Sequence, residues 1–137
     1  SYHLLHGVAY GLSLLPLRVQ YFISDCIFLP LFYIIRYRRK LVQKNLGDSF
    51  PEKSTVELQK LERQFYPWLC DYVAETVKLL SISNEALLRH IEFQGVDQLE
   101  KVFDEGRNCA AILGHYCNWE WLSASGLSFK RHPEAVT

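Results

Sequence analysis

The residues best suited to chemistry lie in one short stretch, Gly114-His115-Tyr116-Cys117-Asn118-Trp119-Glu120-Trp121, directly after the apolar run CAAIL. His115 and Glu120 are five positions apart, which on a continuous α-helix places the two side chains about 140° apart. They can therefore meet only if the backbone turns between them. In that geometry the Glu120 carboxylate accepts a hydrogen bond from one imidazole nitrogen and stabilises the ring as the other nitrogen takes a proton. Such a pair would activate a hydroxyl group as a nucleophile.

Other interpretations of this stretch stay open from the residues alone. A histidine five positions before an acid arises often by chance, so a structural histidine is the default interpretation. A metal site made of His115, Cys117, Glu120 and His132 matches no common zinc spacing, and we expect no metal. Cys117 has a histidine neighbour but no evident activating group, which favours a small packing residue over a nucleophile.

Charge divides the chain near residue 46. Residues 1–46 carry six Lys or Arg against one acid, and residues 47–137 carry nine against fourteen, so the parts have net charges of about +5 and −5. We expect residues 1–46 to form a hydrophobic and basic membrane-associating helical segment, and residues 47–137 to form part of a globular domain. The whole chain is neutral, so its charge predicts no nucleic-acid partner.

The first part is mostly apolar and aromatic from Leu4 to Ile35. Charged residues interrupt it, and no uncharged run reaches the roughly 18 residues of a simple spanning helix. Two shorter helices are expected, one ending near Leu15 and one beginning near Pro16, with a bend at Pro30.

A basic cluster follows this apolar segment and consists of Arg36, Arg38, Arg39 and Lys40. An aromatic, apolar segment that ends in basic residues suits insertion beside anionic lipid head groups, where each basic residue contributes about 1 kcal/mol. Membrane association is the preferred interpretation, and a buried helical hairpin with a solvated charged end is the alternative.

A long helix is expected after the turn GDSFPEKS, because Ser54 and Glu57 form the pattern of a capping box. Pro67 is expected to kink this helix. Its predicted buried face follows three- and four-residue steps through Leu58, Leu61, Phe65, Trp68 or Leu69, Tyr72, Thr76 and Leu79.

A strand, a helix and a second strand are expected before the stretch GHYCNWEW. The segment HIEFQG alternates in polarity, VDQLEKVFDE shows one apolar helical face, and NCAAILG is a short apolar run. This order predicts a βαβ unit with a parallel pair of strands. His115 would then follow the carboxyl end of a buried strand, where open α/β sheets place ligands.

Several blocks of the chain resemble the lipid A biosynthesis (lauroyl and myristoyl) acyltransferases of the lysophospholipid acyltransferase superfamily. GHYCNWEW is similar to their H-x-x-x-x-D/E block, in the variant that has glutamate and a preceding Asn-Trp. LPLRVQYFISD, RYRRKLVQKNLGDSFPEKS and FQGVDQLEKVFDEGRNCAAILGH resemble other blocks in the same order. Cys117 departs from the pattern, since glycine is usual at its position.

The resemblance implies a glycerol-phosphate-acyltransferase-like α/β fold, with a helical membrane-associated N-terminus followed by the first βαβ part of a mixed sheet. It also implies an O-acyltransferase that uses no cofactor. His115 would be the general base and Glu120 its partner, while Asn118 and Trp119 would contact substrate. The donor would be acyl carrier protein or acyl-CoA, and the acceptor a hydroxyl of a lipid A precursor.

The same resemblance predicts a location at the cytoplasmic face of the inner membrane of a Gram-negative bacterium. Family members are about twice as long, so we expect the chain to be an N-terminal fragment that is inactive by itself. The alternatives are an acyltransferase for another glycolipid or an aminolipid, and a membrane-binding module without enzymatic activity.

Overall fold

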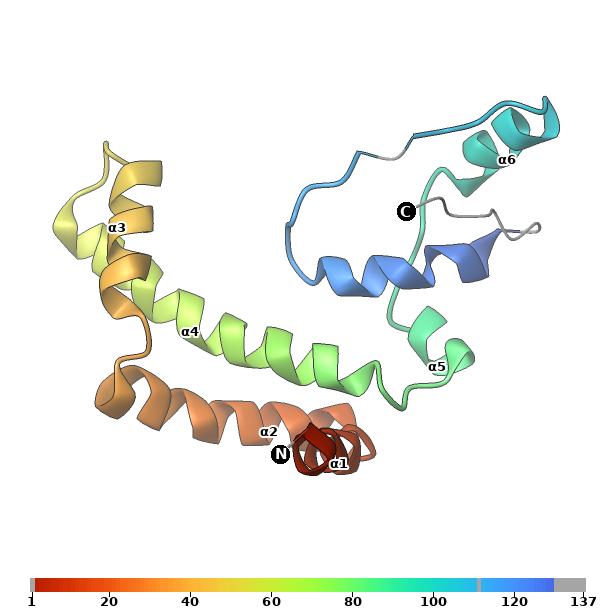
Figure 1. Ribbon diagram of the computed structural model, residues 1–137. Helices are drawn as coiled ribbons and strands as arrows, with labels where there is room; N and C mark the ends of the chain where they lie inside the picture. Colours follow the sequence, from red (N-terminus) through yellow and green to blue (C-terminus); the bar gives the residue numbers. More distant parts are fainter. Residues whose placement is uncertain (1, 111, 130–137) are drawn as a thin grey trace. The chain divides into compact units, whose positions relative to one another are not determined.

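The computed structural model describes residues 2–110 and 112–129, and the chain divides into two compact units, Ser1–Leu80 and Ser81–Thr137 (Figure 1). The first unit holds helices α1 (Tyr2–Ser13), α2 (Leu17–Leu29), η1 (Pro30–Ile35), α3 (Arg39–Ser49) and α4 (Thr55–Lys78). The second holds α5 (Asn84–Leu88), α6 (Val96–Asp104) and η2 (Trp119–Ser128).

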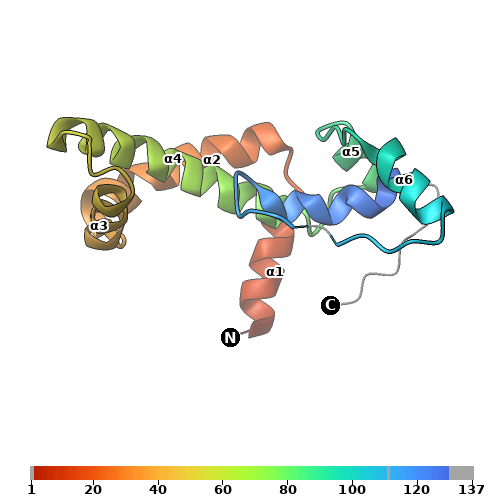
Figure 2. The same cartoon turned by 90° about the horizontal axis from the view of Figure 1, so that it is seen from above.

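The first helices begin and end where the sequence predicts. Pro16 immediately precedes α2, and α1 crosses the α2–α4 pair steeply (Figure 2). The turn between α1 and α2 leaves carbonyl oxygens without partners inside a helix. Two side chains donate to them: Gln20 from α2 and Lys78 from the end of α4, whose Nζ lies 2.8 Å from the Ser13 carbonyl oxygen. The turn is thereby tied to both neighbouring helices.

The helix changes type at Pro30, where η1 begins as a π-helix. Proline has no backbone N–H and its ring crowds the preceding turn, which disfavours a regular α-helical continuation. The combined helix Leu17–Ile35 spans 19 residues and is long and apolar enough to cross a membrane by length and composition, and 17% of its most apolar 18-residue window is buried within the structure. The sequence predicted no simple spanning helix, because charged residues interrupt the apolar run. Arg18 and Asp25 do not exclude a span by the measure of length and composition.

Helix α4 is the longest element and forms the centre of the first unit (Figure 1). The predicted capping box is confirmed, since Glu57 Oε2 accepts from Ser54 N at 2.8 Å and Ser54 Oγ accepts from Glu57 N at 3.4 Å. The helix continues through Pro67. Its buried residues, Glu62, Tyr66 and Cys70, do not belong to the predicted face.

The second unit corrects the predicted fold class. Helix α6 lies where the sequence predicts it, between Gly95 at φ 81° and Gly106 at φ 71°. The two predicted strands, 90–95 and 108–114, are absent from the described residues of these segments, which have neither helix nor sheet. The glycerol-phosphate-acyltransferase-like α/β fold with a βαβ unit is therefore wrong for the described part of the chain.

The physical reason is that a helix forms its backbone hydrogen bonds within itself, whereas a strand needs a neighbouring strand to form them. Two isolated strands are at best marginally stable without further strands or a covering helix. No described residue covers the second predicted strand at Ile112 and Leu113, which are 97% and 61% exposed. A short apolar run alone does not identify a strand.

Candidate active site

The backbone reverses direction between His115 and Glu120. The Gly114 carbonyl accepts a hydrogen bond from Tyr116 N–H at 2.9 Å, which closes a three-residue turn centred on His115. Cys117 then has φ 53°, in the left-handed region. Asn118 precedes η2 and its carbonyl accepts from Trp121 N–H at 3.3 Å. The turn that the pair requires is therefore present.

Cys117 holds a conformation that suits glycine better than cysteine. A residue with a Cβ is less stable in the left-handed region by about 1–2 kcal/mol, and glycine avoids this penalty. The glycine that is usual here in the resembling family would adopt this φ readily. The departure at Cys117 thus bears on the stability of the turn that separates His115 from Glu120.

His115 is exposed and its ring lies against Trp119, with ring centroids 4.4 Å apart at an interplanar angle of 59°. Glu120 is half-buried in the first turn of η2. Among the described residues no hydrogen bond or ion pair joins the His115 and Glu120 side chains. The structure therefore brings His115 to Trp119, and the two members of the predicted pair stand on either side of the turn.

Aromatic contacts hold η2 in place within the second unit. The Trp121 ring meets the His90 ring edge-on at 6.0 Å, and Phe129 meets Phe103 of α6 at 5.9 Å. Ala124 is buried at 3% exposure. The helix that carries Trp119 and Glu120 is thus anchored by residues that were not predicted to belong to a site.

The basic cluster is divided by the fold. Arg36 and Arg38 are exposed and both have left-handed backbones, with φ 52° and 51°, in the turn between η1 and α3. Lys40 is exposed as well. Arg39 instead turns to α4, where its Nε lies 2.7 Å from Glu62 Oε1 and its Nη2 lies 3.2 Å from Oε2. Three of the four predicted basic residues are therefore exposed.

Glu62 is 1% exposed, which makes its ion pair with Arg39 an internal one. Gln43 Nε2 also donates to both carboxylate oxygens, at 3.2 and 3.0 Å. Burial by itself raises the pKa of Glu62, but the hydrogen bonds from Arg39 and Gln43 and the Arg39 charge lower it below its ordinary value. Glu62 was not predicted as a site residue. In the sequence it is distinguished only as an acidic residue next to the predicted apolar face of the long helix.

The Arg39 guanidinium also lies over the Phe32 ring, 4.5 Å from its centroid. Phe32 in turn packs edge-on against Tyr66, whose hydroxyl donates to the Tyr37 carbonyl at 2.6 Å. These contacts join η1, the basic turn and α4 into one packed cluster.

No group of three or more His, Cys, Asp and Glu side chains within the described residues is arranged to hold a metal ion. The possible ligand His132 lies outside those residues.

A family model described as bacterial lipid A biosynthesis acyltransferase matches residues 2–137. No curated protein and no solved structure matches the chain significantly. The match includes both units, so the turn at His115 and the basic cluster both lie within it.

Proposed function

The chain belongs to the bacterial lipid A biosynthesis acyltransferase family, and we propose that it is part of an enzyme that transfers a fatty acyl chain from acyl carrier protein or acyl-CoA to a hydroxyl of a lipid A precursor. The observation that supports a role for His115 is the reversed backbone between it and Glu120. An exposed imidazole beside such a turn is accessible to a hydroxyl group on a lipid.

In the proposed mechanism His115 takes the proton from the acceptor hydroxyl as the hydroxyl oxygen attacks the thioester carbonyl. The carbonyl oxygen then becomes an oxyanion, which Asn118 or a nearby backbone N–H stabilises. When the intermediate collapses, the C–S bond breaks and the thiolate takes the proton from His115. The products are an ester on the acceptor and a free thiol on the carrier.

Glu120 has to meet the imidazole for this step, and the ring now lies on Trp119. We propose that His115 rotates about its side-chain bonds from Trp119 to Glu120 when substrate binds. Trp119, once uncovered, offers an aromatic face to the substrate. This gives Asn118 and Trp119 the substrate contacts expected of them.

The first unit is proposed to associate with the cytoplasmic face of the inner membrane. Its helices expose many large apolar side chains, among them Leu5, Phe22 and Ile34, which are 72%, 69% and 79% exposed. Arg36, Arg38 and Lys40 would contact anionic head groups. Arg39 would instead hold the basic turn on α4 through Glu62.

The test measures transfer of radiolabelled lauroyl groups from acyl carrier protein, and separately from CoA, to a lipid A precursor in membranes that contain the full-length protein, since the 137 residues by themselves are expected to be inactive. We expect His115→Ala and Glu120→Gln each to lower the rate by about 10²-fold or more, because proton transfer by a positioned base contributes about 10²–10⁴-fold. His6→Ala and Glu105→Gln alter other exposed residues and serve as matched controls.

Unchanged transfer in His115→Ala would contradict the role of His115 as the base. If the unaltered full-length protein transfers nothing but still binds membranes, the proposed activity is wrong and a membrane-binding module is the better description.

A further inference from the structure

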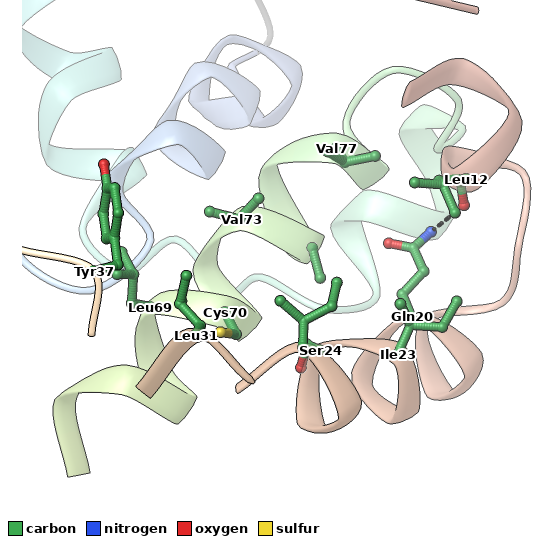
Figure 3. Close-up of a pocket in the computed structure, with 12 residues that line it drawn as sticks. Leu12, Gln20, Ile23, Ser24, Leu31, Tyr37, Leu69, Cys70, Val73 and Val77 are labelled. Atoms are coloured by element: carbon green, nitrogen blue, oxygen red, sulfur yellow. Dashed lines mark hydrogen bonds between the residues drawn. The ribbon is translucent and has the colours of Figure 1, made fainter. Parts of the chain in front are cut away.

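A pocket of about 400 Å³ lies in the first unit between α2 and α4, beside the end of α1 (Figure 3). Most of its lining is aliphatic, including Ile27 and Leu31 on one side and Val73 and Val77 on the other. Ile27 is 51% exposed and Val73 is 52% exposed, so the pocket opens at the protein surface there. Its volume falls in the range of small-molecule sites, about 300–1,000 Å³.

Two buried polar side chains, Gln20 and Ser24, line this pocket. Gln20 is only 4% exposed, and its Nε2 donates to the carbonyl oxygens of Leu12, Ser13 and Leu15 at 3.1, 3.3 and 3.0 Å. Three acceptors around one end of the amide require that end to be the nitrogen, which fixes the amide orientation. Figure 3 shows the nitrogen directed at the Leu12 carbonyl and the oxygen turned away from it.

The Gln20 oxygen, Oε1, is buried and accepts no hydrogen bond from any residue that the structure describes. A buried acceptor without a partner lowers the free energy of unfolding by about 1–3 kcal/mol, and such atoms are rare in native proteins. A group that enters the pocket and donates a hydrogen bond would remove this penalty.

Water is a poor candidate for that donor, because a buried water needs two to four polar partners. The hydroxyl of Ser24, which also lines the pocket, has one proton, and its acceptors are Asp71 and the Tyr21 carbonyl, both on the protein. Tyr37 lies at the opposite end of the pocket from Gln20 (Figure 3). The remaining walls suit an apolar ligand that carries one donor.

We propose that this pocket binds a single-chain lipid whose alkyl chain ends in a hydroxyl group, and that this hydroxyl donates to Gln20 Oε1. The pocket follows α2 from Gln20 to Leu31, which is about 16 Å at 1.5 Å per residue. An extended chain advances about 1.2 Å per bond, since a residue of three bonds spans about 3.6 Å, so the pocket holds roughly 13 bonds. The site does not depend on the proposed acyl transfer, and His115→Ala is expected to leave it unchanged.

The test compares two ligands of equal chain length, 1-dodecanol and dodecyl methyl ether. Only the alcohol can donate a hydrogen bond. Binding of each to the purified chain is measured by equilibrium dialysis in a bile-salt detergent, which has no alkyl chain to compete. We expect the ether to bind about tenfold more weakly than the alcohol, the effect of one buried hydrogen bond.

A variant of the pocket wall provides the second arm. Ala74→Phe places a ring in the open space and is expected to weaken 1-dodecanol binding at least tenfold, while Val56→Phe, at a site that is 75% exposed on the same helix, is expected to change nothing. Equal affinity for the alcohol and the ether would overturn the role of Gln20. Unchanged binding in a folded Ala74→Phe protein, or no binding of 1-dodecanol to the unaltered chain, would overturn the site. If Ala74→Phe does not fold, the comparison of the two ligands decides.

Discussion

Replacement of Arg39 by methionine should be among the most destabilising single changes in the first unit. Methionine keeps the length and apolar stem of the side chain, so it can still cover the Phe32 ring. It removes two charge-assisted hydrogen bonds to Glu62, which is 1% exposed and keeps only its contacts with Gln43. A buried carboxylate then loses its counter-charge.

Breaking a buried ion pair by removing one partner typically lowers the free energy of unfolding by about 3–5 kcal/mol. The lower end, about 3 kcal/mol, applies here because Gln43 still donates to both oxygens and because the Arg39 side chain is 28% exposed. The matched control is Lys44→Met. It breaks the Lys44–Asp48 pair, which has the same 2.7 Å distance but lies at 71% and 65% exposure, where solvent screening leaves a pair with little effect on stability.

The contribution of Glu62 to the pH dependence of stability should have opposite signs in the unaltered protein and in Arg39→Met. In the unaltered chain the pKa of Glu62 is lowered on folding, so its contribution is present above the unfolded pKa of about 4.3 and is lost as the pH falls below that value. In Arg39→Met burial remains and its main counteracting charge is gone, so the pKa of Glu62 should be raised. The folded variant then takes up a proton more readily than the unfolded chain, and its deficit should shrink as the pH falls toward 4.

Urea unfolding followed by circular dichroism at pH 7 and pH 4 measures both effects. The double variant Arg39→Met with Glu62→Leu should recover most of the loss at pH 7, because it leaves no unpaired charge. The reasoning is refuted if Arg39→Met costs no more than Lys44→Met, or if its deficit is the same at both pH values.

Two further predictions concern the turns. Cys117→Gly should raise the free energy of unfolding of the second unit by about 0.5–1 kcal/mol in thermal unfolding, because it removes a Cβ from a left-handed residue, whereas Cys117→Ala keeps the Cβ and should show no gain. Arg36→Asn, Arg38→Asn and Lys40→Gln together should weaken binding to phosphatidylglycerol vesicles by about 3 kcal/mol, or roughly 10²-fold; asparagine is chosen because it tolerates the left-handed backbone. Lys60→Gln is the control on α4, and equal losses for the two proteins would contradict a specific role of the basic turn.

The local features of the chain could be predicted where neighbouring residues decide them. The Ser54 capping box, the start of α2 after Pro16 and the position of α6 depend on neighbouring residues, and the structure confirms them. The strands could not be predicted in this way. Their existence depends on partners from other parts of the chain, and the described residues supply none.

The buried face of α4 shows the same limit. Periodicity predicted a face through Leu58 and Leu61, but the residues most deeply buried include the charged Glu62. A carboxylate is buried when a partner reaches it, and that partner, Arg39, is 23 positions away. Gln20 is similar, since it interrupts an apolar helix and its burial depends on the carbonyl groups at the end of α1.

The family, the helical N-terminal segment and the need for a turn between His115 and Glu120 follow from residue types and short spacings alone. Packing between distant residues instead pairs Arg39 with Glu62, places His115 against Trp119, and directs Gln20 to a pocket with an unpaired oxygen in the described part of the chain. The physical reason is that the cost of burying a polar group depends on the partners that surround it. Those partners are brought together by packing between helices, which local sequence spacing does not specify.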